Sequence, residues 1–324
     1  MDSKRLTQIL DHFAGRRVLV IGDLMLDHYL WGHTDRISPE APVPVVAVEE
    51  ETFLPGGAAN VIHNLHALGA EVAAIGVVGD DGNAEKLRDL LAAERVDLMG
   101  LVVDADRPTT AKTRIIARQQ HLVRADREAR EPVSGAVQEQ LVEIIRDAHD
   151  VEALFVSDYA KGVVTPAVMD AVREAMQHLG RPAVVDPKGR DFEKYRGVTS
   201  ISPNQSEALG ALNFEGSDEE TVVGAGHELV KRFNFETVCM TRSEKGVSLF
   251  ERGGKVTHIP ALEHEVFDVS GAGDTAAAVY TLALLAGASH PEAAYIGNLA
   301  GGVVVGKVGV ATASVEEIAA VGGG

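Results

Sequence analysis

The chain has 324 residues, 45% of them hydrophobic and 24% charged, so its composition excludes a disordered chain and supports a substantial core. Its formal net charge of −18 argues against general binding to nucleic acids or anionic membranes, because most of the surface repels a polyanion. The single cysteine, Cys239, cannot form an internal disulfide, and we find neither a signal-peptide pattern nor the ~20 consecutive apolar residues of a membrane span. We therefore expect a cytoplasmic protein without a nucleic-acid or membrane partner.

The N-terminal part predicts a buried strand followed by an extended, proline-rich segment. The β-branched run 17–21 leads into Gly22 and Asp23, and ligands of open α/β sheets bind outside the carboxyl ends of the strands. Asp23, and Asp27 one turn further, are therefore candidates to hold ligand hydroxyls, although an aspartate here can also simply cap a turn. Residues 36–48 place three prolines among valines, which favours an exposed edge segment of a small separate sheet.

A glycine pair precedes the next predicted helix, at residues 58–68. Gly56, Gly57 and the nearby Asn60 would let a polyhydroxyl ligand approach the backbone closely. His63 and His66 are spaced i, i+3 on this helix, but no third ligand stands near them, so we do not expect a metal site there. Further along, the pattern predicts a strand at 72–79, a helix at 83–94 and a strand at 97–103.

The segment 107–127 is basic within an acidic chain, with six Lys or Arg residues and one acid. If residues 110–118 form a strand, Lys112, Arg114 and Arg118 share one face. A charged edge strand that only prevents aggregation has the same appearance. The charge contrast favours a lid that meets an anionic substrate.

Four further predicted strands, at 151–157, 183–186, 198–202 and 236–240, each end in a polar or charged turn. Strands alternate with helices of 10 to 15 residues through the chain, which predicts an α/β fold with a doubly wound, mostly parallel sheet flanked by helices. We expect a single domain over residues 1–324, with a small β-sheet lid formed by residues 36–48 and 107–126.

The segment Asp268 to Asp274 breaks a short β-prone run at 265–269 and opens an apolar helix at 275–285. Its glycines and the helix start favour an anion above them, and a carboxylate beside an anion suits a proton acceptor in phosphoryl transfer. Two other readings remain: a first-turn aspartate that stabilises the helix dipole, and a dinucleotide fingerprint of a dehydrogenase. The second ranks lower, because the acid about 20 residues on, Glu292, follows Pro291 and fits the first turn of a helix.

These motifs resemble the ribokinase-like (phosphofructokinase-B) family of sugar kinases. The resemblance rests on Gly56-Gly57, the Asn-x-x-Glu of 204–207 and the Asp-x-x-Gly-Ala-Gly-Asp of 268–274. More narrowly, GDLMLDHYLWG, RISPEAPVPVV, PGGAANVIHNLHALGA and VSDYAKG are similar to the D-glycero-β-D-manno-heptose 7-phosphate kinases, over about residues 17–314. This implies ATP-dependent phosphorylation of the anomeric C1 hydroxyl to heptose 1,7-bisphosphate, for ADP-heptose and lipopolysaccharide core synthesis. Many relatives carry a further adenylyltransferase domain, and the sequence does not decide whether one belongs here.

The resemblance also assigns roles to single residues. Asp274 would be the general base, and the N–H groups of Gly271, Ala272 and Gly273 would stabilise the transferred phosphoryl group. The nucleotide side would comprise Asn204, Gln205, Ser206, Glu207, Lys188, Thr241, Arg242, Gly246 and Asn298, with Glu207 holding Mg²⁺ through water. The sugar side would comprise Asp23, Gly56, Gly57, Asn60 and Asp158, with Lys112, Arg118 and Lys161 on the distal phosphate.

ATP, Mg²⁺ and a response to K⁺ are implied as well, together with a homodimer formed through the lid. Two alternatives stay open: a kinase of another sugar, such as fructose 6-phosphate, ribose or a ketose, and a non-catalytic sugar- or nucleotide-sensing module. The presence of Asp274 together with Asn204 and Glu207 argues against the module.

Overall fold

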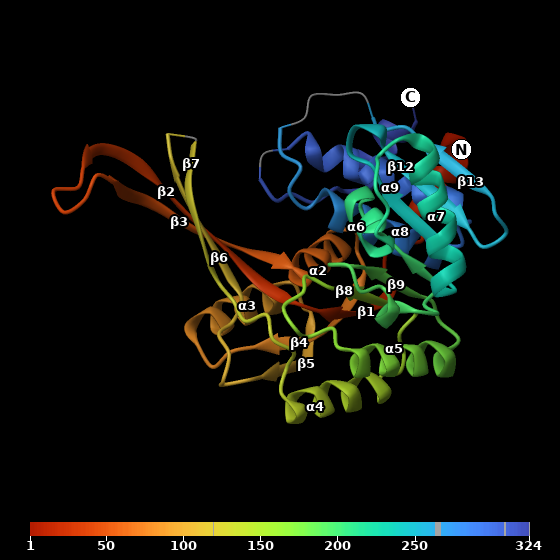
Figure 1. Ribbon diagram of the computed structural model, residues 1–324, viewed down its shortest axis with the longest axis horizontal. Helices are drawn as coiled ribbons and strands as arrows, with labels where there is room; N and C mark the ends of the chain where they lie inside the picture. Colours follow the sequence, from red (N-terminus) through yellow and green to blue (C-terminus); the bar gives the residue numbers. More distant parts are fainter. Residues whose placement is uncertain (119, 263–266, 308, 324) are drawn as a thin grey trace.

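A nine-stranded sheet forms the centre of the molecule, in the order β13-β12-β11-β10-β9-β8-β1-β4-β5. The computed structural model describes residues 1–118, 120–262, 267–307 and 309–323 (Figure 1). The strands pair in parallel from β5 to β11, while β12 and β13 are antiparallel. Their bounds are β1 Arg17–Gly22, β4 Glu71–Val78, β5 Asp97–Val103, β8 Ala153–Ser157, β9 Ala183–Asp186, β10 Ser200–Ile201, β11 Thr237–Thr241, β12 Val247–Glu251 and β13 Val256–Ile259.

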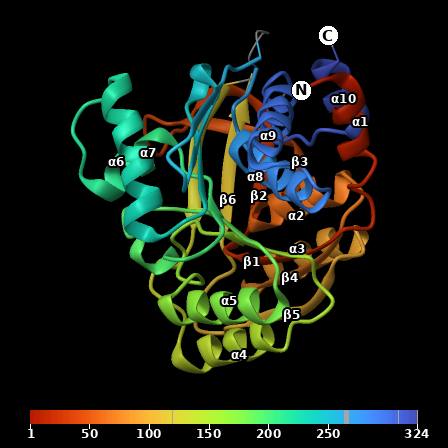
Figure 2. The same cartoon turned by 90° about the vertical axis from the view of Figure 1, so that its right-hand side faces the viewer.

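Helices cover both faces of this sheet, because alternate side chains of each central strand point to opposite sides. In β1, Val18 and Val20 join one buried cluster, while Leu19 and Ile21 join the other. The first face carries α1 Ser3–Leu10, α2 Ala58–Ala67, α3 Gly82–Ala93, α8 Ala272–Leu285, α9 His290–Val305 and α10 Val315–Gly322. The second carries α4 Gly135–Arg146, α5 Pro166–Leu179, α6 Gln205–Leu212 and α7 Glu219–Phe233. Figure 2 shows α4 and α5 below the sheet, and the terminal helices α1 and α10 side by side.

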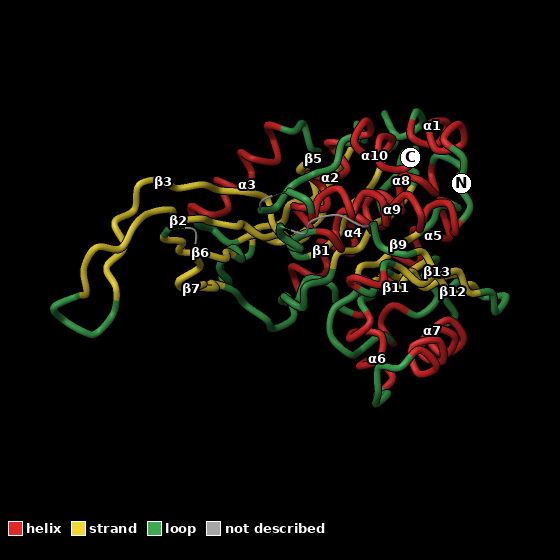
Figure 3. The backbone as a smooth tube through the Cα atoms, turned by 90° about the horizontal axis from the view of Figure 1, so that it is seen from above, coloured by secondary structure: helices red, strands yellow, loops and turns green. Residues whose placement is uncertain are grey.

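A second sheet of four strands projects from this body (Figures 1 and 3). Its order is β3-β2-β6-β7, with β2 and β6 parallel and the other two pairs antiparallel. The strands are β2 Leu24–Ile37, β3 Pro44–Gly57, β6 Ala111–Ala117 and β7 Gln120–Arg127. We call this sheet the lid.

The doubly wound, mostly parallel sheet with its separate small sheet is confirmed. The expected lid segments, 36–48 and 107–126, cover only part of the lid. Strand β2 already begins at Leu24, just after the body strand β1, and β3 continues to Gly57. The side chains of β2 are buried near the body and exposed further out, so the strand has no continuous apolar pattern by which to detect it.

Two local expectations near the glycine turn need correction. Helix α8 begins at Ala272 and not at residue 275, so Asp274 lies inside its first turn. Of the β-prone run 265–269, residues 265 and 266 lie outside the described residues, and 267–269 form no strand. The N–H groups of Phe267 and Asp268 instead donate to the carbonyl of Val305 at the end of α9.

Two short 3₁₀ helices, η1 Glu193–Tyr195 and η2 Ser243–Lys245, complete the described elements. Within the described ranges, every helix lacks the combination of length and hydropathy that a membrane crossing requires.

Candidate active site

A cavity of about 160 Å³ lies at the carboxyl ends of strands β8 to β11, opposite the start of α8. This is the edge of the sheet where four polar strand ends were expected to meet, and the structure brings them together. Its lining residues are Asp158, Tyr159, Asp186, Pro187, Lys188, Ser202, Asn204, Glu207, Thr241, Gly271, Gly273 and Asp274.

The glycine turn presents Asp274 to this cavity. Gly271 caps α8 with φ 79°, a left-handed conformation that favours glycine, and a Cβ there would lie 2.9 Å from Asn60 Nδ2. Asp274 is 5% exposed, and its side chain accepts hydrogen bonds from Asn60 Nδ2 at 2.7 Å and from the Tyr159 hydroxyl at 2.6 Å. Burial raises the pKa of Asp274, while these two donors act in the opposite direction. Asp274 is therefore a buried carboxylate held at the wall of an open cavity.

The first turn of α8 supplies backbone donors at the same place, because the first N–H groups of a helix have no intrahelical acceptor. Gly271 and Gly273 line the cavity. Ala272 does not, and its N–H donates to the carbonyl of Val269 at 3.3 Å. Of the three expected donors, the two glycines are therefore the better placed to meet an anion in the cavity.

The Asn-x-x-Glu motif forms the N-terminal cap of α6 on the other side of the cavity. Asn204 Oδ1 accepts the Glu207 N–H at 2.8 Å, and Glu207 Oε2 accepts the Asn204 N–H at 3.0 Å. Glu207 Oε1 also receives the Lys188 ammonium at 2.6 Å, and the Lys188 side chain is about half exposed. This motif therefore builds the helix start as well as lining the cavity.

Asp186, at the end of β9, adds a carboxylate that was absent from the candidate residues. Burial raises the pKa of Asp186 well above its ordinary value, and the charges of Asp274 and Glu207 raise it further. No donor among the described residues forms a hydrogen bond to its carboxylate. The cavity therefore gathers the acidic side chains of Asp186, Asp274 and Glu207 beside the Lys188 ammonium.

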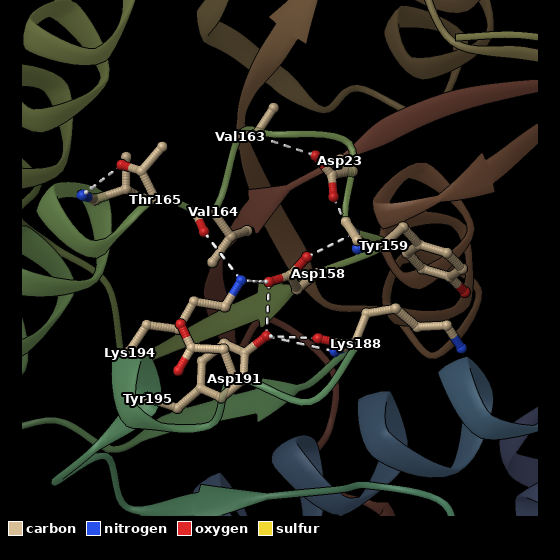
Figure 4. A network of polar contacts seen from close by, with 12 residues as sticks. Asp23, Asp158, Tyr159, Val163, Val164, Thr165, Lys188, Asp191, Lys194 and Tyr195 are labelled. Carbon is tan, nitrogen blue, oxygen red and sulfur yellow. Dashed lines mark hydrogen bonds and ion pairs between the residues drawn. The ribbon is translucent and has the colours of Figure 1, made fainter. Parts of the chain in front are cut away.

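Asp158 and Asp23 are held by protein groups behind the cavity (Figure 4). Asp158 Oδ2 accepts from Lys194 Nζ at 2.5 Å and from the Tyr195 hydroxyl at 2.6 Å. Asp23 is 1% exposed, and its carboxylate accepts three backbone N–H groups of the loop 159–163. Asp158 lines the cavity but Asp23 does not, so the expected sugar contact of Asp23 has no geometric support.

Asp27 is the neighbouring aspartate with more access to the glycine pair. Its Oδ2 would lie 2.6 Å from a Cβ placed on Gly56, so only glycine leaves it room. Arg114 donates to Asp27 Oδ1 at 2.5 Å. Gly57 ends β3 with φ 56° and caps α2, which carries Asn60.

The three lid and loop cations differ in their surroundings. Lys112 Nζ lies 5.4 Å from the centre of the Tyr159 ring, and burial lowers its pKa. Lys161 is paired with Glu128 at 2.7 Å, and both side chains are mostly buried. Arg118 follows the end of β6 with φ 51°, is 70% exposed and reaches Asp35 at 3.2 Å, so it does not share the face of Lys112 and Arg114 as expected. Lys112 is the best placed of the three to meet a substrate phosphate.

Several expected nucleotide residues lie around the cavity and not in it. Arg242 is 4% exposed at its side chain and holds Glu219 through two bonds of 2.6 Å, so its guanidinium is already occupied. Arg242 also donates to Gln205 Oε1, and Asn298 Nδ2 donates to the carbonyl of Pro260. Thr241 lines the cavity, while Gly246 accepts the Arg242 N–H in a turn with φ 80°.

Four residues that line the cavity were missed at the sequence level: Tyr159, Asp186, Pro187 and Ser202. Each ends a predicted strand or lies in the turn that follows one, where ligands of such sheets bind. Their position at or just after the end of a predicted strand was therefore a signal in the sequence that could have identified them. His63, by contrast, pairs with Glu94, and the described part of the chain holds no group of three His, Cys, Asp or Glu residues arranged for a metal.

Comparison with known proteins agrees with this arrangement of motifs. The model of the pfkB family carbohydrate kinases matches residues 16–318. Bifunctional protein HldE of Geotalea uraniireducens is 45% identical over 321 residues, which is 99% of this chain and 66% of the relative. Bifunctional protein HldE of Geobacter metallireducens is 44% identical over 319 residues, 98% of this chain and 65% of the relative. The chain thus spans slightly less than two thirds of the length of these curated relatives.

Solved structures with the same fold include two sugar kinases. Phosphofructokinase-2 from Escherichia coli in complex with potassium superposes with a TM-score of 0.78 at 20% identity, covering 95% of this chain and 98% of that one. Arabidopsis thaliana ribokinase complexed with ribose and ATP superposes with a TM-score of 0.72 at 18% identity, with the same coverage. At these identities the likeness establishes the fold, which is ribokinase-like.

Proposed function

Because the chain belongs to the pfkB family of carbohydrate kinases, we propose that it phosphorylates D-glycero-β-D-manno-heptose 7-phosphate at the anomeric C1 hydroxyl with ATP, for ADP-heptose and lipopolysaccharide core synthesis. The observation that carries the proposal is the Asp274 carboxylate, held in the cavity wall beside the start of α8. The similarity of the heptose-kinase segments quoted above and the relatives named HldE support the choice of sugar.

In this mechanism the C1 oxygen attacks the γ-phosphorus, the bond from that phosphorus to the ADP oxygen breaks, and the hydroxyl proton passes to Asp274. A positioned general base contributes about 10²- to 10⁴-fold to rate. The backbone donors at Gly271 and Gly273 face charge on the transferred group, and the Lys188 ammonium offers a positive charge across the cavity. Closure of the lid over the sugar would exclude water and limit ATP hydrolysis.

The acidic side of the cavity fits a magnesium ion. Mg²⁺ binds few carboxylates and keeps several waters, and Asp186 offers carboxylate oxygens without a hydrogen-bond donor among the described residues. Both Glu207 oxygens already have protein partners, which suits contact through water. Asp186 and Glu207 would hold the ion, which when bound neutralises phosphate charge. The K⁺ response stays a prediction.

Lys112 is the cation that we assign to the distal phosphate of the sugar. It projects from β6 toward Tyr159 at the cavity, whereas Lys161 is already neutralised by Glu128. Lys112→Met should raise KM for heptose 7-phosphate by about ten- to a hundredfold, the value of a hydrogen bond to a charged group. KM for an unphosphorylated sugar should not change. Lys86→Met, which removes a lysine over the Phe53 ring, is the matched control.

A coupled ATP-turnover assay with Mg²⁺ tests the function directly, comparing heptose 7-phosphate with fructose 6-phosphate and ribose. Asp274→Asn should lower kcat by orders of magnitude while ATP affinity is largely retained. Asp218→Asn is the control, because asparagine caps α7 as well as aspartate does and position 218 lies away from the cavity. Turnover by Asp274→Asn close to that of the unmodified protein would remove the base assignment, and preference for ribose would remove the heptose assignment.

The homodimer through the lid also stays a proposal. All eight residues of β7, at the edge of the lid, are exposed in the single chain. Sedimentation of the purified chain would detect the dimer, and deletion of the lid hairpin tip at 38–43 would test whether the lid forms it.

A further inference from the structure

We propose that Tyr159 is a positioning residue for Asp274: its hydroxyl orients the carboxylate that receives the sugar proton, and Asp23 in turn holds Tyr159 in place. The inference rests on the proposed function, in which Asp274 is the base. The inference assigns a structural role at the site to Tyr159, which lines the cavity, and to Asp23, which does not line it.

The two oxygens of Asp274 are each fixed by one donor from a different segment. The Tyr159 hydroxyl donates to Oδ1 at 2.6 Å, and Asn60 Nδ2 donates to Oδ2 at 2.7 Å. Two donors on opposite oxygens define the plane of the carboxylate, so its rotation about the side-chain bonds is restrained. Each carboxylate oxygen can accept more than one hydrogen bond, so capacity for a substrate hydroxyl remains.

The loop that carries Tyr159 is fixed from behind by Asp23 (Figure 4). Asp23 Oδ2 accepts the N–H groups of Tyr159 at 2.7 Å and Lys161 at 3.0 Å, and its Oδ1 accepts that of Val163 at 3.2 Å. Asp23 is itself buried at the end of β1. In Figure 4 the Tyr159 ring points away from this anchor. Tyr159 is thus held in a fixed position between strand β1 and helix α8, because its backbone is bound by Asp23 and its hydroxyl by Asp274.

Tyr159 also remains a donor under the conditions in which Asp274 must accept. Burial and the nearby Asp274 charge raise the pKa of Tyr159 well above its ordinary value, so the hydroxyl keeps its proton. Among the described residues, the other charged groups that act on Asp274 or on which it acts include Asp27 and Lys112 from the lid, and Asp186 and Lys188 from the end of β9. Their charges are the same in a Tyr159→Phe variant, which isolates the hydroxyl.

Tyr159→Phe tests the inference, with Tyr280→Phe as the matched control. Tyr280 is also buried and hydroxyl-bonded, and it lies on the same helix as Asp274 but away from the cavity. We expect Tyr159→Phe to lower kcat about ten- to a hundredfold, the scale of a small misplacement of a catalytic group, with KM for ATP nearly unchanged. The acid limb of the kcat profile should move to higher pH, because loss of a donor disfavours the carboxylate. Tyr280→Phe should change neither kcat nor the position of the acid limb.

Asp23→Asn provides a second variant, which leaves the hydroxyl present but weakens its anchor. It should shift the acid limb in the same direction by a smaller amount. Infrared titration of the protonated carboxyl band, identified by its loss in Asp274→Asn, follows the same group without any turnover. The titration midpoint should rise in Tyr159→Phe.

The outcomes separate the two proposals. If the unmodified chain phosphorylates a different sugar, or none, the proposed function fails, while the infrared titration still decides the role of Tyr159. If the Asp274 titration and the acid limb stay where they are in Tyr159→Phe, the positioning role is overturned, whichever sugar is the substrate.

Discussion

Replacing Gly271 by alanine should damage turnover much more than stability, because the added methyl group meets a residue that holds the catalytic carboxylate. Gly271 has φ 79°, and a Cβ there would lie 2.9 Å from Asn60 Nδ2, where ordinary contact begins at 3.4 Å. Asn60 is 1% exposed and donates to Asp274 at 2.7 Å. The steric strain from the added methyl group would therefore be passed to the Asp274 carboxylate through the Asn60 side chain.

The expected loss of stability is small, and the expected loss of turnover is larger. A left-handed conformation costs an L-residue roughly 1–2 kcal/mol, and alanine recovers about 0.4–1 kcal/mol by restricting the unfolded chain. The net loss of unfolding free energy should be about 1 kcal/mol. Asn60 must move by roughly half an ångström, and because a displacement of 1 Å can cost about 10²-fold in rate, kcat should fall about tenfold or more.

Gly287→Ala is the matched control at the other end of α8. Gly287 has φ 83°, so alanine suffers the same backbone strain, but no atom lies within 4 Å of its added Cβ. Chemical denaturation should show similar losses of stability for both variants, and the coupled ATP-turnover assay should show a large loss of kcat for Gly271→Ala alone. Equal turnover of the two variants would refute the argument that the glycine turn acts through Asn60.

Three further outcomes concern stability. The bonds of Arg5 and Ser289 lower the pKa of Glu292 from 4.5 to about 2, so they stabilise the fold above pH 4.5, and this contribution disappears as the pH falls toward 2. Glu292→Gln should therefore be less stable at pH 7, and denaturation curves should show the difference closing between pH 4.5 and 2. In α7, Gly226→Ala should destabilise by about 1–2 kcal/mol, because its Cβ would lie 2.4 Å from the Phe250 ring. Gly224→Ala, whose nearest neighbour would be 3.9 Å away, should stabilise by up to about 1 kcal/mol in the same measurement.

The parts of the fold that follow local patterns could be predicted from the sequence. The strand expected at 97–103 is β5, and the strand expected at 72–79 differs from β4 by one residue at each end. Buried parallel strands have continuous apolar runs, so this signal needs no information from distant segments. The lid strand β2 has no such run, because its environment changes from buried to exposed along its length.

The candidate site was partly predictable for the same reason. The turns at strand ends and the glycine turn all lie at the carboxyl edge of the sheet, and the topology of a parallel sheet gathers them. Asn204, Glu207, Gly271 and Asp274 accordingly line one cavity. Tyr159 was available in one of these turns, but its type gave no indication that it would meet Asp274, 115 residues away.

The sequence by itself determined the α/β architecture, the family motifs and the position of Asp274 at a helix start, because each of these depends on residues close together in the chain. Only the tertiary structure decided which polar groups are occupied by the protein itself. Asp23 is held by a loop 136 residues further along, and Arg242, in the turn after β11, is paired with Glu219 at the start of α7. A charged side chain is available to a ligand only if no folded neighbour has already neutralised it, and those neighbours are set by packing between distant segments.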